Sequence, residues 1–415
     1  MSARLRRVGQ LFALGTLAAT PLRAQHEMHA PTGGPAPLVA ASAGARAILL
    51  GTSVDPGFAR RRLAEGYLTQ PMLHGHAALR GGLLAVQGMI DFEGATLARG
   101  ELTPGAYGEG YVDRRHPHTW LHELVATVAT PRWRGGELSL SGGKGFAPFG
   151  TDDPMARPLA RFPVNHHLSQ ILERAVLVGA ARWRPLALEY GVFNGDEPES
   201  PTDAPNAAHF GDSWAARVTL RPLAGFELQG SSARVASPES PTGHGFDHHK
   251  RSGSLRAERD TRLGRAYLLG EWASTDLFSR GRRAFHLSTV LAEASLHRER
   301  LWAAARYERT LRPEEERLAN PFRTPYPTAE VQILGTTRFD VATAAVGGEW
   351  SLRALSLAPF AEGSLVTPRA TTALAAFVPE YFYGRSRLVA LSLGVRLAAG
   401  MPMHRVGRYS VAVGH

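Results

Sequence analysis

The chain of 415 residues contains no cysteine, and beyond its first residues it also has no long uninterrupted apolar stretch. Without cysteine there is no disulfide framework, no thiolate metal site and no cysteine nucleophile. No later stretch reaches the roughly 18 to 20 apolar residues that a membrane-spanning helix requires. Any part of the chain that spans a membrane must therefore be built from β-strands, because lipid leaves no other way to satisfy the backbone.

Lysine is almost absent, since Lys144 and Lys250 are the only two lysines in the sequence. The formal net charge is +10, and removal of the four arginines in residues 1–24 leaves 10 − 4 = +6. This excess is too small to indicate a nucleic-acid partner. Arginine can bind oxyanions with two parallel hydrogen bonds, but a compositional bias towards arginine and alanine explains the same count.

The N-terminus has the layout of a secretory signal peptide. Arg4, Arg6 and Arg7 precede an uncharged stretch over 8–19, and a short segment ending in Ala24 follows. We expect cleavage after Ala24, so that residues 1–24 are a signal peptide and the mature chain is exported. Residues 25–79 show weak periodicity and are expected to form a periplasmic lead-in to a single folded domain over residues 80–415.

Segments of about ten residues then alternate small or apolar residues with polar ones, as spanning strands of a barrel do. In 387–399, Val389, Leu391 and Leu393 fall on one face, which suits lipid, and Ser392 falls on the other. Similar alternation predicts strands over 81–93, 120–130, 137–145, 175–183, 186–194, 214–221, 226–235, 265–275, 285–294, 301–310, 339–350 and 355–366.

The predicted fold is all-β, a transmembrane antiparallel β-barrel of about 14 strands, with 12 or 16 also compatible because bacterial barrels close on even numbers. Long insertions over 195–212, 237–250 and 311–328 contrast with short turns elsewhere, which is typical of outer-membrane barrels. Tryptophans lie in or beside most of the predicted strands, as interfacial residues would. A soluble β-sandwich has the same alternation and stays an alternative.

Four short segments, at 142–150, 171–175, 190–195 and 217–222, resemble the phosphate-selective porin O/P-like family, over about residues 142–235. The first reads Gly-Gly-Lys-Gly-Phe-Ala-Pro-Phe-Gly, and Ile-Leu-Glu-Arg-Ala follows after a loop. The resemblance implies an outer-membrane channel for passive diffusion of small hydrophilic solutes. In the phosphate-selective members lysine and arginine line the lumen; lysine is nearly absent here, so phosphate selectivity is not carried over.

The C-terminus also departs from the family, because barrels commonly end in an aromatic residue and this chain ends in Val-Gly-His. Either the last strand lies over 388–399 and is followed by a short tail, or 408–413 contributes to it.

The predicted functional site is the loop 151–170, which is too long for a hairpin turn. In porins such a loop can fold into the lumen, where opposed charges at a constriction select ions. An exposed surface loop with solvated charges is the alternative. The candidate constriction residues are Lys144, Asp152, Asp153, Arg157, Arg161, His166, His167, Glu173 and Arg174.

Histidine suggests a second hypothesis, because 17 are present. His26, Met28 and His29 at the mature N-terminus combine imidazole with thioether, which suits copper. Copper is the one cofactor considered, and scattered surface histidine is the alternative. The other candidate metal ligands are His116, His118, His122, His248, His249, Met401, Met403 and His404.

No serine-hydrolase elbow, His-Glu-x-x-His pair or phosphate-binding loop appears in the sequence, so we expect no enzyme. The hypothesis is a porin-like channel in the bacterial outer membrane, with a preference for anions. The competing hypothesis is a copper-handling or structural barrel with a closed lumen. Expected partners are outer-membrane lipid, the barrel-assembly machinery and small solutes, with a homotrimer as the candidate assembly and no nucleic acid.

Overall fold

The computed structural model describes residues 38–57, 60–79, 82–97, 100–103, 114–115, 118–164, 166–198, 200–238, 245–315, 333–371 and 378–409. Its main feature is a single antiparallel sheet that closes on itself as a barrel of 16 strands. The first strand, β1 (Val39–Asp55), pairs with both β2 (Leu63–Leu79) and β19 (Leu388–Gly400), and these pairings complete the ring. Closure leaves no sheet edge exposed. The predicted fold class is therefore confirmed, and the predicted number of about 14 strands was slightly low.

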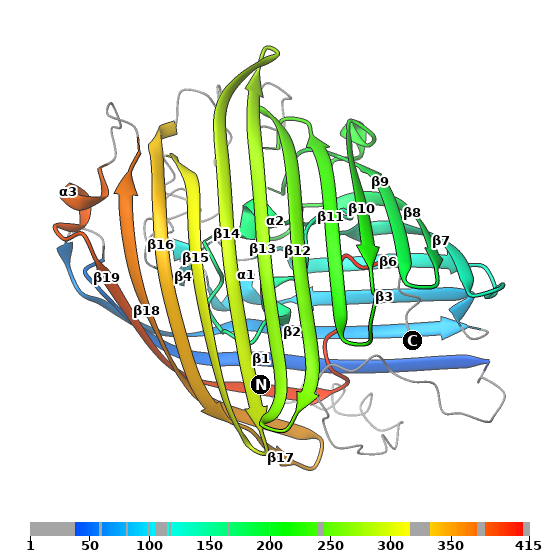
Figure 1. The fold of residues 1–415 in the computed structure, drawn as a ribbon, viewed down its shortest axis with the longest axis horizontal. Coiled ribbons are helices and arrows are strands. Elements are labelled where there is room, and N and C mark those ends of the chain that lie inside the picture. The colour runs from blue at the N-terminus through cyan, green and yellow to red at the C-terminus, as the bar shows by residue number, and fades with distance from the viewer. Residues whose placement is uncertain are drawn as a thin grey trace, which may run out of the picture.

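The rest of the wall follows the order of the chain (Figure 1). Its strands are β3 (Leu84–Asp91), β6 (Leu121–Ala129), β7 (Gly136–Gly145), β8 (Arg174–Trp183), β9 (Leu186–Phe193), β10 (Ser213–Leu220), β11 (Phe226–Val235), β12 (Asp247–Thr261), β13 (Gly264–Ser279), β14 (Arg282–Arg298), β15 (Leu301–Glu315), β16 (Ile333–Gly348), β17 (Trp350–Leu352) and β18 (Leu355–Ala370). Because β16 and β17 both pair with β18, β17 continues β16 and is not a further strand.

The remaining elements are small. They are the strand pair β4 (Glu101–Leu102) and β5 (Arg114–Arg115), the helices α1 (Glu93–Thr96), α2 (His166–Ser169) and α3 (Pro379–Tyr383), and the 3₁₀ turns η3 (Pro154–Ala156) and η4 (Ala207–His209). Among the described residues, no helix has both the length and the apolar character needed to cross a membrane.

The wall has an apolar outer face, as the alternation predicted. Along β19, the side chains of Val389, Leu391 and Leu393 are 42%, 57% and 71% exposed, whereas Ala390 and Ser392 between them are buried. The period of two in a strand sends successive side chains to opposite faces. The outer face is thus suited to lipid and the inner face carries the polar residues, which is the chemistry of a membrane barrel.

The two ends of the barrel differ. At one end, here called the short-turn end, neighbouring strands are joined by connections such as 184–185, 262–263 and 299–300. At the other, the long-loop end, the connections include 92–120 and 146–173. The β13–β14 hairpin is the exception at the long-loop end, where a two-residue turn joins long strands that rise above their neighbours (Figure 1).

Three strands were missed by the sequence analysis, namely β1, β2 and β12. The predicted lead-in over 25–79 is wrong for residues 39–79, which form β1 and β2. The alternation of β2 shifts by one residue at Gln70, which has a positive φ of 51°, beside an irregularity in its pairing with β1. A strand with such a bulge is missed when side chains are required to alternate strictly between two faces. Residues 247–250, predicted as loop, begin β12, whose inner face is polar and whose outer face is apolar only at Gly253, Leu255 and Ala257.

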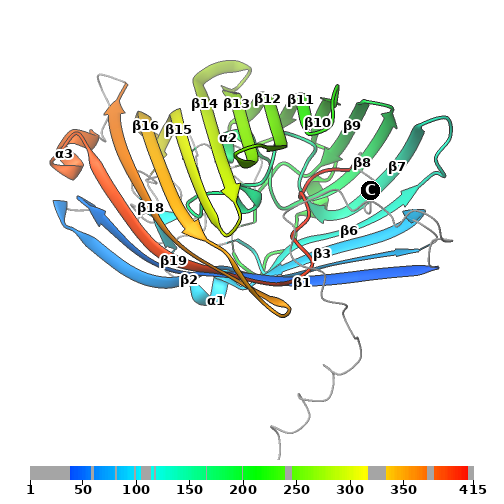
Figure 2. The same cartoon turned by 60° about the horizontal axis from the view of Figure 1, so that its bottom comes forward.

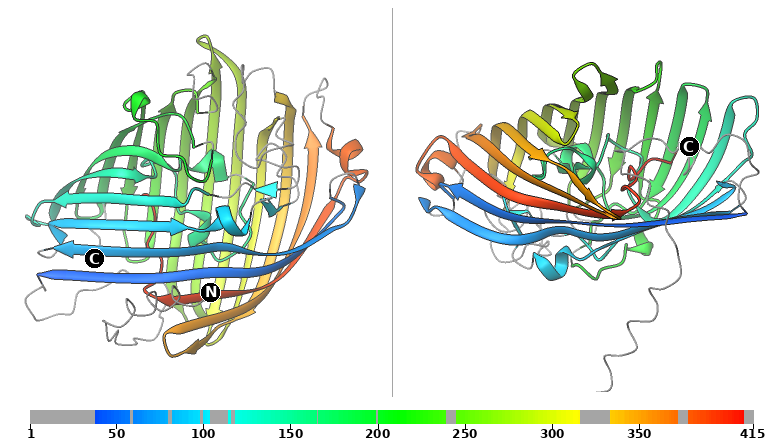
Figure 3. Two further views of the ribbon diagram at one scale, coloured as in Figure 1. Left: turned by 180° about the vertical axis from the view of Figure 1, so that it is seen from behind. Right: turned by 90° about the horizontal axis from the view of Figure 1, so that it is seen from below.

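Apolar packing inside the barrel joins the wall to segments that enter the lumen, which is the space that the wall encloses. One buried cluster contains Met72 and Met89 from the wall, Phe146 and Phe162 from the β7–β8 connection, and Met403 from the C-terminal segment. The views from behind and from below show chain segments within the curve of the sheet (Figure 3). The interior is therefore a packed core over part of its height.

Substitution of Gly143 should destabilise the barrel, because its φ of 147° is strained for other residues and an added Cβ would collide with the Leu124 carbonyl oxygen. We expect Gly143→Ala to lower the free energy of unfolding by about 1 to 3 kcal/mol. Gly142→Ala is the matched control, because there the nearest atom to an added Cβ is 3.5 Å away. Urea unfolding in lipid vesicles measures both, and equal stability of the two variants would contradict the steric argument.

Candidate functional site

The connection between β7 and β8, residues 146–173, folds into the lumen and is here called the insert. The backbone amides of Ala160 and Arg161 donate to the carboxylate of Glu362 on β18, at 2.8 and 3.2 Å. At the other side of the barrel, the amide of Gly150 donates to the hydroxyl of Ser231 on β11 at 3.0 Å. The insert thus spans the interior between distant parts of the wall.

The charged residues predicted in the loop 151–170 are buried in this arrangement. Asp152, Asp153, Arg157 and Arg161 are each at most 4% exposed. Solvated charges on a surface loop would be largely exposed, so the surface-loop alternative is wrong for these four residues.

Arg157 fastens one part of the insert. Its guanidinium donates to the carbonyl oxygen of Asp152 at 2.9 and 3.1 Å and pairs with Glu271 on β13 at 3.2 Å. Asp153 caps the η3 turn by accepting from the Met155 amide at 2.7 Å. These bonds fix the turn of the insert that presents Asp152 to the rest of the lumen.

Residues 401–409, here called the C-terminal tail, enter the lumen from the short-turn end. Gly400 has a φ of 75°, and a Cβ at this position would collide with the Ala43 carbonyl oxygen, so glycine allows the chain to turn here. The Met401 amide then donates to that oxygen at 2.9 Å. Figure 2 shows the red segment after β19 turning back into the curve of the sheet towards β8–β11. The tail is therefore neither free nor part of the last strand, because β19 ends at Gly400.

The tail is held by ionic contacts with the wall. Arg405 forms two hydrogen bonds with the carboxylate of Glu227 on β11, at 2.9 and 3.0 Å. Arg408 lies 2.9 Å from the same carboxylate. Further along, the Tyr409 amide donates to Glu189 on β9 at 2.7 Å, and the Tyr409 hydroxyl donates to the Phe146 carbonyl oxygen at 2.6 Å.

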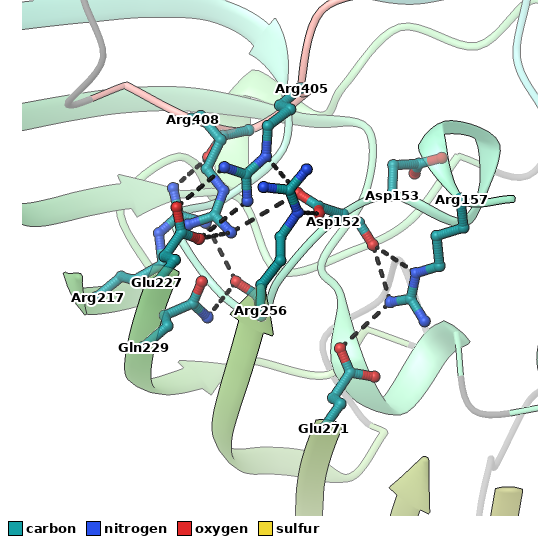
Figure 4. A network of polar contacts seen from close by, with 12 residues as sticks. Asp152, Asp153, Arg157, Arg217, Glu227, Gln229, Arg256, Glu271, Arg405 and Arg408 are labelled. Carbon is teal, nitrogen blue, oxygen red and sulfur yellow. Dashed lines mark hydrogen bonds and ion pairs between the residues drawn. The ribbon is translucent and has the colours of Figure 1, made fainter. Parts of the chain in front are cut away.

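Asp152 joins the tail to the insert, as Figure 4 shows. Its carboxylate is 2.5 Å from the guanidinium of Arg405 and 2.9 Å from that of Arg256 on β12. Burial alone would raise the pKa of the Asp152 carboxyl, but the positive charges of Arg405 and Arg256 hold it well below its ordinary value. Two segments that enter from opposite ends of the barrel thus meet at one ionised carboxylate.

Glu173 is the last residue of the insert and directly precedes β8. It accepts hydrogen bonds from the amide and hydroxyl of Thr119, at 3.1 and 3.0 Å, and lies 2.7 Å from Nδ1 of His122. Burial would raise the pKa of Glu173, but the bond and charge of His122 hold it at about 2. Lys144 donates to the same Thr119 hydroxyl at 2.6 Å, so Lys144 and Glu173 form one cluster as the sequence grouping suggested.

The other predicted constriction residues lie apart from this cluster. Arg174 donates to the carbonyl oxygen of Gly195 and pairs with Glu197, so it anchors the β9–β10 connection. His166 and His167 are the first two residues of α2, with ring centroids 4.3 Å apart. The His167 carbonyl oxygen accepts from Lys250 on β12 at 2.8 Å. Both lysines of the chain are thus turned inward.

The described residues do not include the candidate metal ligands His26, Met28, His29 and His116. At the other end, Met403 packs in the apolar cluster of the lumen, and Nε2 of His404 lies 2.6 Å from the carboxylate of Glu123. The Met-Pro-Met-His segment therefore anchors the tail.

Sequence reasoning missed the tail and its partners Glu189, Arg217 and Glu227. Arg217 pairs with Glu189 at 2.5 and 2.8 Å and also donates to the Gly407 carbonyl oxygen. The alternation does place these three residues on inward faces of their strands, which was an available signal. Nothing in the sequence indicated that a segment following the last strand would return to meet them.

The Arg405 contacts predict a loss of stability on substitution. Arg405→Ala removes the guanidinium that bonds most closely to both Asp152 and Glu227, and we expect it to lower the free energy of unfolding by about 1 to 3 kcal/mol. Arg309→Ala is the control, because Arg309 makes a similar ion pair with Asp340 at 2.6 Å but its side chain is 56% exposed. Urea unfolding measures both, and an equally small change in the two variants would mean that the tail contributes nothing.

The sequence matches no protein-family model and no curated protein. Among solved structures it is similar to an anion-selective porin from Comamonas acidovorans, with 10% identity, a TM-score of 0.52, and coverage of 87% of this chain and 99% of that one. A loop-deletion mutant of the outer membrane protein OmpT from Vibrio cholerae gives 10% identity, a TM-score of 0.49, and coverage of 88% and 100%. At this identity the likeness concerns the fold alone, and the phosphate-selective O/P-like family is not confirmed. The chain has the closed β-barrel fold of bacterial porins.

Proposed function

We propose that this protein is an outer-membrane channel for small hydrophilic solutes, with a passage narrowed by the insert and the tail. The supporting observation is the junction at Asp152, where the two segments meet inside a barrel with the fold of porins. Opposed charges at a narrow point are a common means of selecting ions.

A preference for anions is supported by cations that form no direct ion pair with a carboxylate of the described residues. Lys144 and Lys250 donate to hydroxyl and carbonyl oxygens. Arg46 donates to the Met155 carbonyl oxygen and the Gln70 side chain, and Arg396 donates to the Pro158 carbonyl oxygen. Carboxylates such as Glu173 lie near these groups but do not bond to them directly, so each group can contribute positive potential to the lumen. The anion selectivity of the porin to which the fold is similar is consistent with this preference.

A barrel with a closed lumen is the second candidate, and burial of the inward charges favours it. Glu271, Glu293 and Arg306 are 3%, 1% and 4% exposed, although they lie on inward faces of the wall. Side chains that line a wide aqueous pore would be more exposed. The two candidates therefore differ in whether the tail and insert leave a passage or act together as a plug.

The partners follow from the same proposal. The apolar outer wall would contact lipid, and the barrel-assembly machinery would insert the chain. A homotrimer is proposed on the precedent of porins such as the trimeric OmpT form from Vibrio cholerae. Copper binding by His26, Met28 and His29 stays a separate proposal, which titration of a peptide covering residues 25–32 against its His26→Ala, His29→Ala version tests.

Removal of the tail should enlarge the passage. We expect a chain truncated after Gly400 to show single-channel conductance at least about twofold above that of the full chain in planar bilayers, because the Arg405 and Arg408 side chains leave the lumen. Truncation after Tyr409 is the control, since it keeps residues 401–409. In a salt gradient, Lys144→Gln, Lys250→Gln should shift the reversal potential away from anion preference.

Each outcome of these recordings has a distinct meaning. A silent full chain with an open truncated chain would identify a closed barrel plugged by its tail. If neither the full chain nor the truncated chain conducts, although insertion is verified and the folded protein shows heat-modifiable migration, the channel proposal is wrong. Equal conductance of the two truncated chains would show that the tail does not narrow the passage.

A further inference from the structure

A second buried polar cluster lies where β3 ends. Asp91 is the last residue of β3, Glu93 is the first residue of α1, and His118 belongs to the segment that leads into β6. They are 0%, 0% and 3% exposed. One ligand-type atom from each lies within 4.8 Å of the other two, which the described part of the chain shows for no other such group.

One oxygen in this cluster has no partner. Oδ1 of Asp91 accepts from the Glu93 amide at 2.8 Å, but Oδ2 makes no hydrogen bond with any described residue although it is buried. Oδ2 is directed at His118, whose Nδ1 lies 3.9 Å away. A buried carboxylate oxygen without a partner is costly, and each such group in a folded protein needs an explanation.

The spacing suits a small metal ion. Nδ1 of His118 is 3.1 Å from Oε2 of Glu93 and 3.9 Å from Oδ2 of Asp91. Ligands at zinc distances in a tetrahedral site are separated by roughly 3.4 Å. Small side-chain rotations therefore bring three ligand atoms to bonding distance, and one position remains for water.

Guanidinium groups and carboxylates lie together at this cluster. Arg115 pairs with Glu93 at 2.8 and 3.1 Å and with Glu101 at 2.9 Å, and its Nη1 lies 3.4 Å from Nδ1 of His118. Arg46 and Arg161 act on these carboxylates from farther away. Arg115 therefore orients the carboxylate of Glu93, whereas the Asp91 carboxylate forms no ion pair with a guanidinium of the described residues.

We propose that Asp91, Glu93 and His118 bind one divalent transition-metal ion, of which zinc is the best match. Two carboxylate oxygens and an imidazole nitrogen form a donor set that zinc accepts. Binding requires that the lone pair of the His118 Nδ1 atom faces the metal. The ion would tie the beginning of the 92–120 connection to its end at the long-loop end of the barrel.

The test is zinc titration of the full-length protein in detergent after treatment with a chelator. The measured quantity is the difference in bound zinc between wild type and variants, because other histidines can also bind the ion. We expect Asp91→Asn and His118→Gln each to lose one zinc per chain, or to weaken it by at least about tenfold. Asp276→Asn is the control, because it removes a carboxylate 2.8 Å from the exposed His286 without a third ligand.

Folding of each variant is checked by heat-modifiable migration, and thermal unfolding gives a second readout. Zinc should raise the unfolding temperature of the wild type and of Asp276→Asn, but not that of His118→Gln. If Asp91→Asn does not fold, His118→Gln carries the test, since it removes no carboxylate. Equal zinc binding by wild type and folded His118→Gln, or no binding by the wild type, would overturn the proposal.

Discussion

Pairing of the first and last strands is the constraint on which the rest of the structure depends. β1 and β19 are in register from Gly44 opposite Gly400 to Asp55 opposite Val389. In lipid each unpaired backbone group costs several kcal/mol, so the ring must close before the wall can be stable in a membrane. All of β19 up to Gly400 belongs to the barrel wall. The chain that follows therefore begins at the edge of the lumen. The turn at Gly400 then directs it inside.

The interior is organised by the need to compensate inward charge. Strand alternation places Glu189, Arg217, Glu227 and Glu271 on the inner face, where an ion without a partner is unfavourable wherever water is excluded. Glu189 and Arg217 pair with each other, whereas the tail pairs with Glu227 and the insert pairs with Glu271. Asp152 links the insert to the tail. The same contacts that stabilise these segments therefore also obstruct the lumen, so stability and permeability are coupled in this barrel.

The cluster at Asp91 follows a different principle from the junction at Asp152. At Asp152 guanidinium groups outnumber the carboxylate and neutralise it. At Asp91 one carboxylate oxygen is left without a described partner, although Arg115 pairs with the neighbouring Glu93. The first arrangement is complete within the protein, whereas the second has a geometry and an unpartnered oxygen that an added cation would complete.

The sequence predicted those features that depend on local pattern. Thirteen of the strands were found because apolar residues repeat every second position along them, and the insert was found because 151–170 is too long for a turn and rich in charge. β2 was missed because the bulge at Gln70 breaks the repeat, and β12 was missed because its outer face is apolar only at Gly253, Leu255 and Ala257. The predicted number of strands was slightly low because strands such as these were missed.

By itself the sequence determined the closed β-barrel class, the polar inner face and the segment that enters it, because each follows from periodicity and loop length. Only the tertiary structure decided that the tail returns to the lumen, that Asp152 meets Arg405, and that Asp91 lies beside His118. Those contacts join residues far apart along the chain, and they depend on register and ring closure, which no local pattern encodes.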